Sequence, residues 1–147
     1  MEMINESIFP EKQIEYAGFW QRFGAAFLDG LILAIPNLVI SYVAGKVSDD
    51  NQITKLIYGT IGQTVIGWLY SALQESGNAR ATLGKKALGI SVVSVNGEKL
   101  TFGQASGRYF GKIISALTLL IGYLMMLWDS RSQTLHDKMA GALVIRD

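Results

Sequence analysis

The residues best suited to chemistry in this 147-residue chain are an arginine and an aspartate at the start of its most apolar stretch. Arg22 directly precedes that stretch, and Asp29 lies inside it, seven positions later. Residues 23–45 are otherwise uncharged and could cross a hydrocarbon core about 30 Å thick as a helix. A carboxylate in such a segment costs at least a few kcal/mol. The pair therefore indicates either ion or solute handling, or a role in holding membrane helices together.

Helical spacing predicts that these two residues share a face. At about 100° per residue, a separation of seven returns to within about 20°, so Arg22, Asp29 and Pro36 form a single stripe. We expect all three to face the same neighbour.

The elements that must position these residues are predicted to be membrane helices. Half of the chain is hydrophobic and only 17% is charged, compared with roughly 25% in soluble domains. We predict an all-α membrane protein of a single domain, 1–147. Its expected parts are an interfacial amphipathic helix at 12–22, transmembrane helices at 23–45 and 56–74, a basic loop with a β-hairpin at 80–108, a third membrane-embedded helix at 110–128, and a C-terminal tail with a short strand at 131–147.

The interfacial helix is predicted from aromatic spacing. Tyr16, Phe19, Trp20 and Phe23 recur at intervals that place their rings on one helical face. Such a rim just before a span is typical of the headgroup level of a bilayer.

The second span carries small and amide residues every three or four positions, which predicts a polar seam along one face. Gln63 and Gln74 belong to it, and Asn37 on the first span is expected to join it. The seam could offer hydrogen bonds to Asp29. It serves either simple packing of small residues or the lining of a permeation path.

The loop that follows is basic and contains a turn signal. Asn96-Gly97, between ISVVSV and EKLTF, predicts a two-residue β-hairpin turn. Lys85, Lys86 and Arg108 are expected to contact anionic lipid headgroups, which would place the loop and the N-terminus on the cytoplasmic side of a prokaryotic cell membrane.

The last apolar stretch, 113–128, is short for a full crossing. The positive-inside rule favours a return to the side of entry, which would let the terminal ALVIR pair with ISVVSV. A turn inside lipid argues against it, because unpaired backbone is costly there. Both arrangements stay open.

Several function classes are disfavoured. The net charge of +1 argues against nucleic acid, and cysteine is absent. His136 is the only histidine, and no spacing suits a metal site or a nucleophile with its base. We therefore expect no cofactor, no metal and no enzymatic activity, with His136 at the surface or at a helix cap.

Three motifs resemble the RDD family of small, mostly prokaryotic integral membrane proteins. They are QRFGAAFLDG at the first span, ATLGKKALGISVV in the loop and QTLHDKMAGALVI near the end, in the right order. The family takes its name from one arginine and two aspartates. The resemblance implies Arg22 for the arginine, Asp29 for the first aspartate and Asp137 for the second, with Asp129 as its competitor. Leu83 departs from the pattern, where the resemblance implies proline.

The resemblance implies little about function: transport of unidentified ligands is suspected, and sodium/proton antiport has been proposed for a relative. The first hypothesis is therefore a transporter, with Asp29 as exchange site for monovalent cations and protons, Asp137 or Asp129 as second carboxylate, and Arg22 as charge balance. Two or three helices enclose too little space for a transport pathway. This hypothesis therefore predicts a homo-oligomer in the lipid bilayer. The second hypothesis is a non-transporting scaffold or lipid-binding or partner-binding subunit, in which Arg22 and the aspartates form a structural ion-pair cluster.

Overall fold

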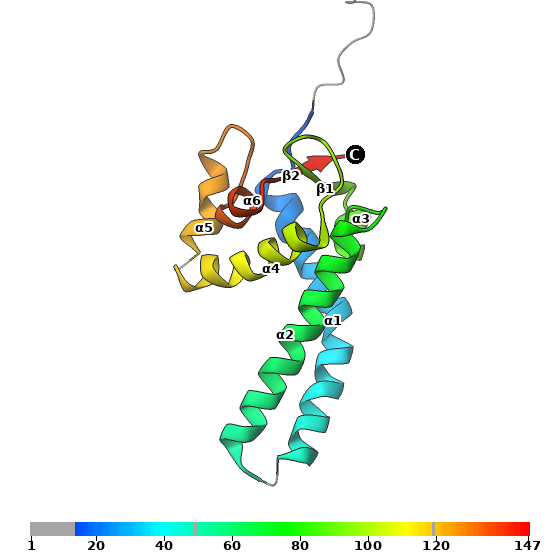
Figure 1. Ribbon diagram of the computed structural model, residues 1–147, viewed down its shortest axis with the longest axis vertical. Helices are drawn as coiled ribbons and strands as arrows, with labels where there is room; N and C mark the ends of the chain where they lie inside the picture. Colours follow the sequence, from blue (N-terminus) through cyan, green and yellow to red (C-terminus); the bar gives the residue numbers. More distant parts are fainter. Residues whose placement is uncertain (1–13, 49, 119) are drawn as a thin grey trace, which may run out of the picture.

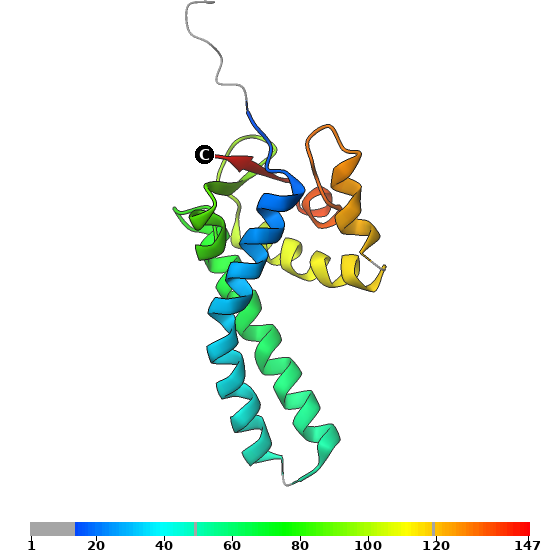
Figure 2. The same cartoon turned by 180° about the vertical axis from the view of Figure 1, so that it is seen from behind.

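The computed structural model describes residues 14–48, 50–118 and 120–147. In chain order its elements are α1 (Phe19–Val47), α2 (Gln52–Ser76), α3 (Leu83–Ala87), β1 (Ile90–Ser94), α4 (Phe102–Leu117), α5 (Ile121–Leu124), η2 (Met125–Leu127), α6 (Leu135–Ala140) and β2 (Ala142–Arg146). Helices α1 and α2 form a long antiparallel hairpin (Figure 1). All other elements gather at one end of this hairpin, which we call the head (Figure 2).

Helix α1 is the strongest membrane candidate. Its 29 residues extend about 43 Å at 1.5 Å per residue, and its most apolar window has a mean hydropathy of 1.9 and is only 6% buried. It contains the predicted span 23–45. Within the described part of the chain, it is the one continuous helix that is long and apolar enough to cross a membrane. Helix α2 contains the predicted segment 56–74, and its crossing of the membrane stays a prediction.

The interfacial helix predicted at 12–22 is wrong for its first part. Residues 14–18 are extended, and α1 begins only at Phe19. The extended segment pairs with the free edge of β2: the amide of Ala17 donates to the carbonyl of Val144 at 2.9 Å, and Tyr16 forms a bridge with Ile145. Backbone pairing on β2 therefore replaces helical hydrogen bonds here. Positions 12 and 13 lie outside the described residues.

The two strands come from distant parts of the sequence. β1 and β2 are antiparallel, with Val92 opposite Val144. ALVIR therefore reaches ISVVSV and covers its edge, as expected in one of the two arrangements left open for 113–128. The contact joins the loop to the C-terminus and closes the head.

The hairpin predicted around Asn96-Gly97 is wrong, although its turn forms. Gly97 has a φ of +79°, and its amide donates to the carbonyl of Ser94 at 2.8 Å. The next residues do not continue as a strand, because Leu100 is buried in the core and Thr101 caps α4. Thr101 and Gln104 form a capping box, which commits the chain to a helix.

The third membrane helix predicted at 110–128 is not one helix. Helix α4 ends at Leu117, Leu120 adopts a left-handed conformation with φ +65°, and α5 with η2 then runs at 114° to α4. Gly122 permits the close return, since a Cβ there would lie 2.5 Å from the Ser115 hydroxyl. Both figures show α4 running sideways from the hairpin and the chain then returning to the head.

The apolar core lies in the head, between the sheet, the start of α1, the end of α2 and the start of α4. Its buried members are Ala17, Ala25, Ala72, Ile90, Val92, Leu100, Ala105, Ala142 and Val144. The far half of the hairpin instead exposes large apolar side chains, such as Ile35 and Leu56, as expected for a lipid-facing surface.

We predict that Gly141→Ala destabilises the protein and that Gly107→Ala does not. Gly141 joins α6 to β2 with φ +62°, a conformation that costs other residues about 1–2 kcal/mol. Gly107 lies in α4 with open space around it, so alanine should gain up to about 1 kcal/mol of helix propensity. Thermal unfolding in detergent should show opposite shifts, and equal shifts would contradict the assignment of strain to Gly141.

Candidate functional site

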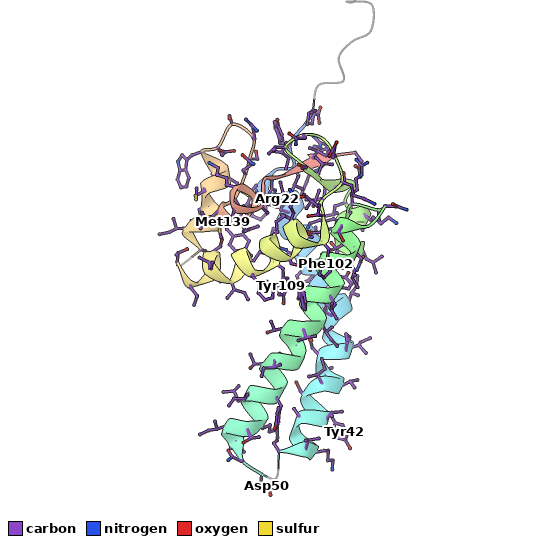
Figure 3. The ribbon with its side chains drawn as sticks, viewed as in Figure 1. Arg22, Tyr42, Asp50, Phe102, Tyr109 and Met139 are labelled. Atoms are coloured by element: carbon purple, nitrogen blue, oxygen red, sulfur yellow. The ribbon has the colours of Figure 1, made fainter. Side chains whose placement is uncertain are left out.

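Five charged side chains, one from each of five helices, form a buried ion-pair network in the head. The network consists of Arg22 from α1, Glu75 from α2, Lys85 from α3, Arg108 from α4 and Asp137 from α6. Figure 3 places Arg22 in the head, near the start of α1. Three cations meet two carboxylates, so the network carries one positive charge in excess.

Asp137 receives two arginines. Its Oδ1 accepts hydrogen bonds from Arg108 Nε at 2.9 Å and Nη2 at 2.8 Å, and its Oδ2 pairs with Arg22 Nη1. The Oδ2 atom also accepts from the amide of Thr134, which starts α6 as part of a capping box. Asp137 therefore fixes α1 and α4 against the start of α6.

Glu75 is the second centre of the network. Its Oε2 pairs with Arg108 Nη1 and its Oε1 with Lys85 Nζ, while the side chain is 1% exposed. Arg108 thus lies between two carboxylates on different helices. The guanidinium of Arg22 also donates hydrogen bonds to the backbone carbonyls of Ser132 at 2.6 Å and Ala17 at 3.3 Å.

Burial and the charges of the network shift the pKa values of Asp137 and Lys85, the two members that lie outside α1, α2 and α4. Burial by itself would raise the pKa of Asp137, but the guanidinium groups of Arg108 and Arg22 outweigh it and hold this pKa well below its usual range. Burial lowers the pKa of Lys85 to about 8, although the charge of Glu75 acts to raise it. Asp137 is therefore ionised at neutral pH.

Asp29 belongs to a different contact. Its carboxylate accepts hydrogen bonds from the Tyr70 hydroxyl at 2.8 Å, the Thr82 hydroxyl at 2.6 Å and the Gly84 amide at 2.8 Å. Within residues 14–48, 50–118 and 120–147, no ion pair joins Asp29 to a basic side chain. The expectation that Arg22 and Asp29 face one neighbour is wrong, because Arg22 turns to α6 and Asp29 to α3.

The competing late aspartate lies elsewhere. Asp129 pairs with the exposed Lys138 at 2.8 Å and accepts hydrogen bonds from the backbone amides of Arg131 and Gln133. The structure therefore joins Asp137, rather than Asp129, to Arg22.

The predicted polar seam forms in part. Gln63 donates to Ser41 across the hairpin at 2.9 Å, whereas Gln74 donates to the carbonyl of Tyr70 in its own helix. Asn37 has a buried Oδ1 with no hydrogen-bond donor among the described residues. The seam does not reach Asp29, which Tyr70 contacts instead.

The three cations predicted to contact lipid headgroups, Lys85, Lys86 and Arg108, differ in their exposure. Lys86 is exposed, but Lys85 and Arg108 are buried in the network. Sequence reasoning missed their partner, Glu75, although this residue is the first charge after the apolar run of α2 and could have been noticed there. It also missed Thr82, whose position before LGKKA is typical of a helix N-cap.

Comparison with known proteins decides the family. The family model described as "RDD family" matches residues 16–141. The chain belongs to the RDD family. Leu83, where the resemblance implies proline, is the first residue of α3, a position at which proline is favoured.

Relatives of this RDD protein carry little functional information in their names. It is 36% identical to the uncharacterized protein YxaI of Bacillus subtilis, over 82% of this chain and 91% of the relative. It is 32% identical to the uncharacterized membrane protein YteJ of the same organism, over 90% and 82%. A proline-rich antigen homolog of Mycobacterium tuberculosis is 32% identical over 85% of this chain and 55% of that protein. No solved structure matches the chain.

Beside the network of this RDD protein lies a cavity of about 350 Å³, which we call the α1 cavity. One face of α1 supplies Phe23, Ala26, Gly30 and Leu33 to its wall, and Met126 of η2 adds to it. The first three of these are exposed, so the cavity opens along α1. Its volume lies within the range of about 300–1,000 Å³ that is usual for small-molecule pockets.

Basic side chains of the head also line the α1 cavity. Arg22, Lys85 and Arg108 contribute from the network, and Lys112 adds a fourth cation. The side chains of Asp29 and His136 are further polar members of the lining. In the described part of the chain, no group of three or more metal-ligating side chains occurs.

His136 is buried, which corrects the expectation of a surface or capping residue. It is 3% exposed, with its Nε2 2.9 Å from the Thr134 hydroxyl and its Nδ1 3.3 Å from the Ser115 hydroxyl. Burial lowers the pKa of His136 to about 3, even though Asp137 acts to raise it. The imidazole is therefore neutral at physiological pH.

We predict that Asp137→Asn destabilises the protein far more than Asp129→Asn. The first change leaves two buried arginines without a carboxylate and should cost about 3–5 kcal/mol, whereas loss of the partly exposed pair with Lys138 should cost at most about 1 kcal/mol. Thermal unfolding in detergent measures both. Equal losses would show that the network does not hold the head.

We predict that His136→Gln flattens the pH dependence of stability between pH 6.5 and about 3. The folded-state pKa lies below the unfolded value of 6.5, so the unfolded chain binds more protons in this window and stability falls as the pH falls. One such site contributes a slope of up to about 1.4 kcal/mol per pH unit. Unfolding midpoints of both proteins from pH 4 to pH 7 test this, and parallel curves would exclude the role of His136.

Proposed function

We propose that this RDD protein is a non-transporting membrane subunit that binds an amphiphile from the bilayer in the α1 cavity. The observation that carries the proposal is the position of the cavity. It opens along an exposed face of the most membrane-like helix, and its other side is the buried ion-pair network. A molecule with an apolar part and a polar part fits such a site.

The ion-pair network acts in this proposal as a structural brace. It ties α1, α2, α3, α4 and α6 together, and thereby fixes the walls of the cavity. Loss of one partner would leave an uncompensated charge, which supports a structural role for the whole cluster. The cavity is complete within one chain, so binding does not require the homo-oligomer that transport would need.

Cation/proton antiport at Asp29 receives less support from the geometry. Three donors occupy its carboxylate, and two of them, Thr82 and Gly84, belong to the turn that begins α3. Asp29 therefore serves in our proposal to fasten α3 onto α1. The antiport hypothesis uses Arg22 to balance the charge of Asp29, but Arg22 forms its ion pair with Asp137 instead.

We expect Gly30→Leu to prevent amphiphile binding. A Cβ at Gly30 meets nothing within 4 Å, so leucine can fill the cavity without displacing backbone. Gly107→Leu is the matched control, because Gly107 is also an uncrowded helical glycine but does not line the cavity. Native mass spectrometry should show about one retained lipid per chain for the native protein and for Gly107→Leu, and a loss of at least tenfold for Gly30→Leu. Equal retention by all three would contradict the proposal.

Liposomes test the competing transport function. Sodium-, potassium- or lithium-dependent proton flux should not exceed that of empty liposomes, either for the native chain or for Asp29→Asn. Flux that the native chain supports and that a folded Asp29→Asn variant loses would overturn the non-transporting proposal in favour of antiport.

A further inference from the structure

Lys112 differs from the other cations of the α1 cavity. Arg22, Lys85 and Arg108 each pair with a carboxylate of the network. Lys112 has no ion-pair partner within 4.0 Å among the residues that the structure describes, although it lines the cavity and is partly buried. It follows Arg108 by four positions, so both lie on the same face of α4.

Every oxygen of the nearby carboxylates already accepts a hydrogen bond or pairs with another cation, and none lies within 4.0 Å of the Lys112 ammonium. Each oxygen of Glu75 is paired with one cation, and each oxygen of Asp137 is paired with an arginine. The oxygens of Asp29 accept from Tyr70, Thr82 and Gly84. An ammonium group in apolar surroundings is costly unless an anion accompanies it.

The charge of the site selects the sign of a ligand. The network has one more cation than it has carboxylates. Lys112 adds a positive charge and the carboxylate of Asp29, which also lines the cavity, adds a negative one, so the groups around the cavity carry one positive charge in excess. The apolar wall, which Phe23, Leu33 and Met126 help to form, selects a ligand that also has hydrocarbon. Along α1, Arg22 and Leu33 are about 16 Å apart, which gives room for a headgroup near the head and the first part of a chain along α1.

We propose that the ligand of the α1 cavity is an anionic phospholipid whose phosphate is bound by Lys112. This inference rests on the proposed amphiphile site and names its ligand class. The phosphate receives the ammonium of Lys112 as a charge-assisted partner, with Arg22 and Arg108 adding favourable field. The acyl chain leaves the cavity along Phe23, Gly30 and Leu33, toward the hydrocarbon that surrounds α1.

The probe is an equimolar mixture of phosphatidylglycerol, phosphatidylcholine and diacylglycerol with identical acyl chains, offered to the full-length protein in detergent. Native mass spectrometry should show phosphatidylglycerol retained about tenfold more than either other lipid. Lys112→Met should reduce this retention by about tenfold or more, as expected for loss of one charge-assisted contact. Lys112→Arg should retain it, and Lys86→Met, at the exposed lysine of α3, should leave it unchanged.

Folding is controlled in the same experiment. Lys112→Met removes a partly buried charge, so its thermal midpoint without lipid should equal or exceed that of the native chain. Reduced lipid retention together with an unchanged or higher midpoint supports direct contact. A lower midpoint that tracks the loss of lipid would assign Lys112 a structural role and overturn the inference.

The two proposals fail in different ways. If the native chain and Gly30→Leu retain equally little lipid of all three classes, the amphiphile site itself is wrong. If Gly30→Leu abolishes retention but the three lipids are held equally and Lys112→Met has no effect, only the anionic headgroup is wrong. Displacement of phosphatidylglycerol by millimolar inorganic phosphate would show a free anion site and overturn the phospholipid assignment.

Discussion

The contact of Arg108 with two buried carboxylates is the constraint on which the head depends. Glu75 lies in the last turn of α2 and Asp137 in the first turn of α6, and the guanidinium between them also sets the position of α4. Arg22 and Lys85 extend the contact to α1 and α3. A charge buried without a partner is strongly unfavourable. Moving any one of these helices away would leave a charge on another helix unpaired, so the network holds all five in place.

The family signature divides into two structural tasks. Arg22 and Asp137 meet in the network, whereas Asp29 accepts donors from α2 and from the start of α3. Both tasks fix a head element onto the hairpin. The α1 cavity lies between them and receives residues from each, which is why we favour a binding function over a path through Asp29.

Membership of the RDD family and a strongly apolar α1 agree with a membrane protein. The bent segment of α4, α5 and η2 places apolar side chains such as Ile113 and Leu117 outward, while Arg108 on the same helix is buried inward. The inward face of α4 carries Arg108 and Lys112, two of the cations that the proposed ligand would meet.

Local features followed from the sequence alone. Continuous apolarity predicted the helix of 23–45, Asn96-Gly97 predicted a turn, and the three motifs identified the family. Tertiary structure decided the partners: that Arg22 binds Asp137 rather than Asp29, that Glu75 joins the network, that β1 pairs with β2 rather than with EKLTF, and that Lys112 is left beside the cavity. The reason is that spacing along a helix fixes only the direction of a side chain. Which charge it meets depends on elements up to 115 positions away, brought close only by packing of the head.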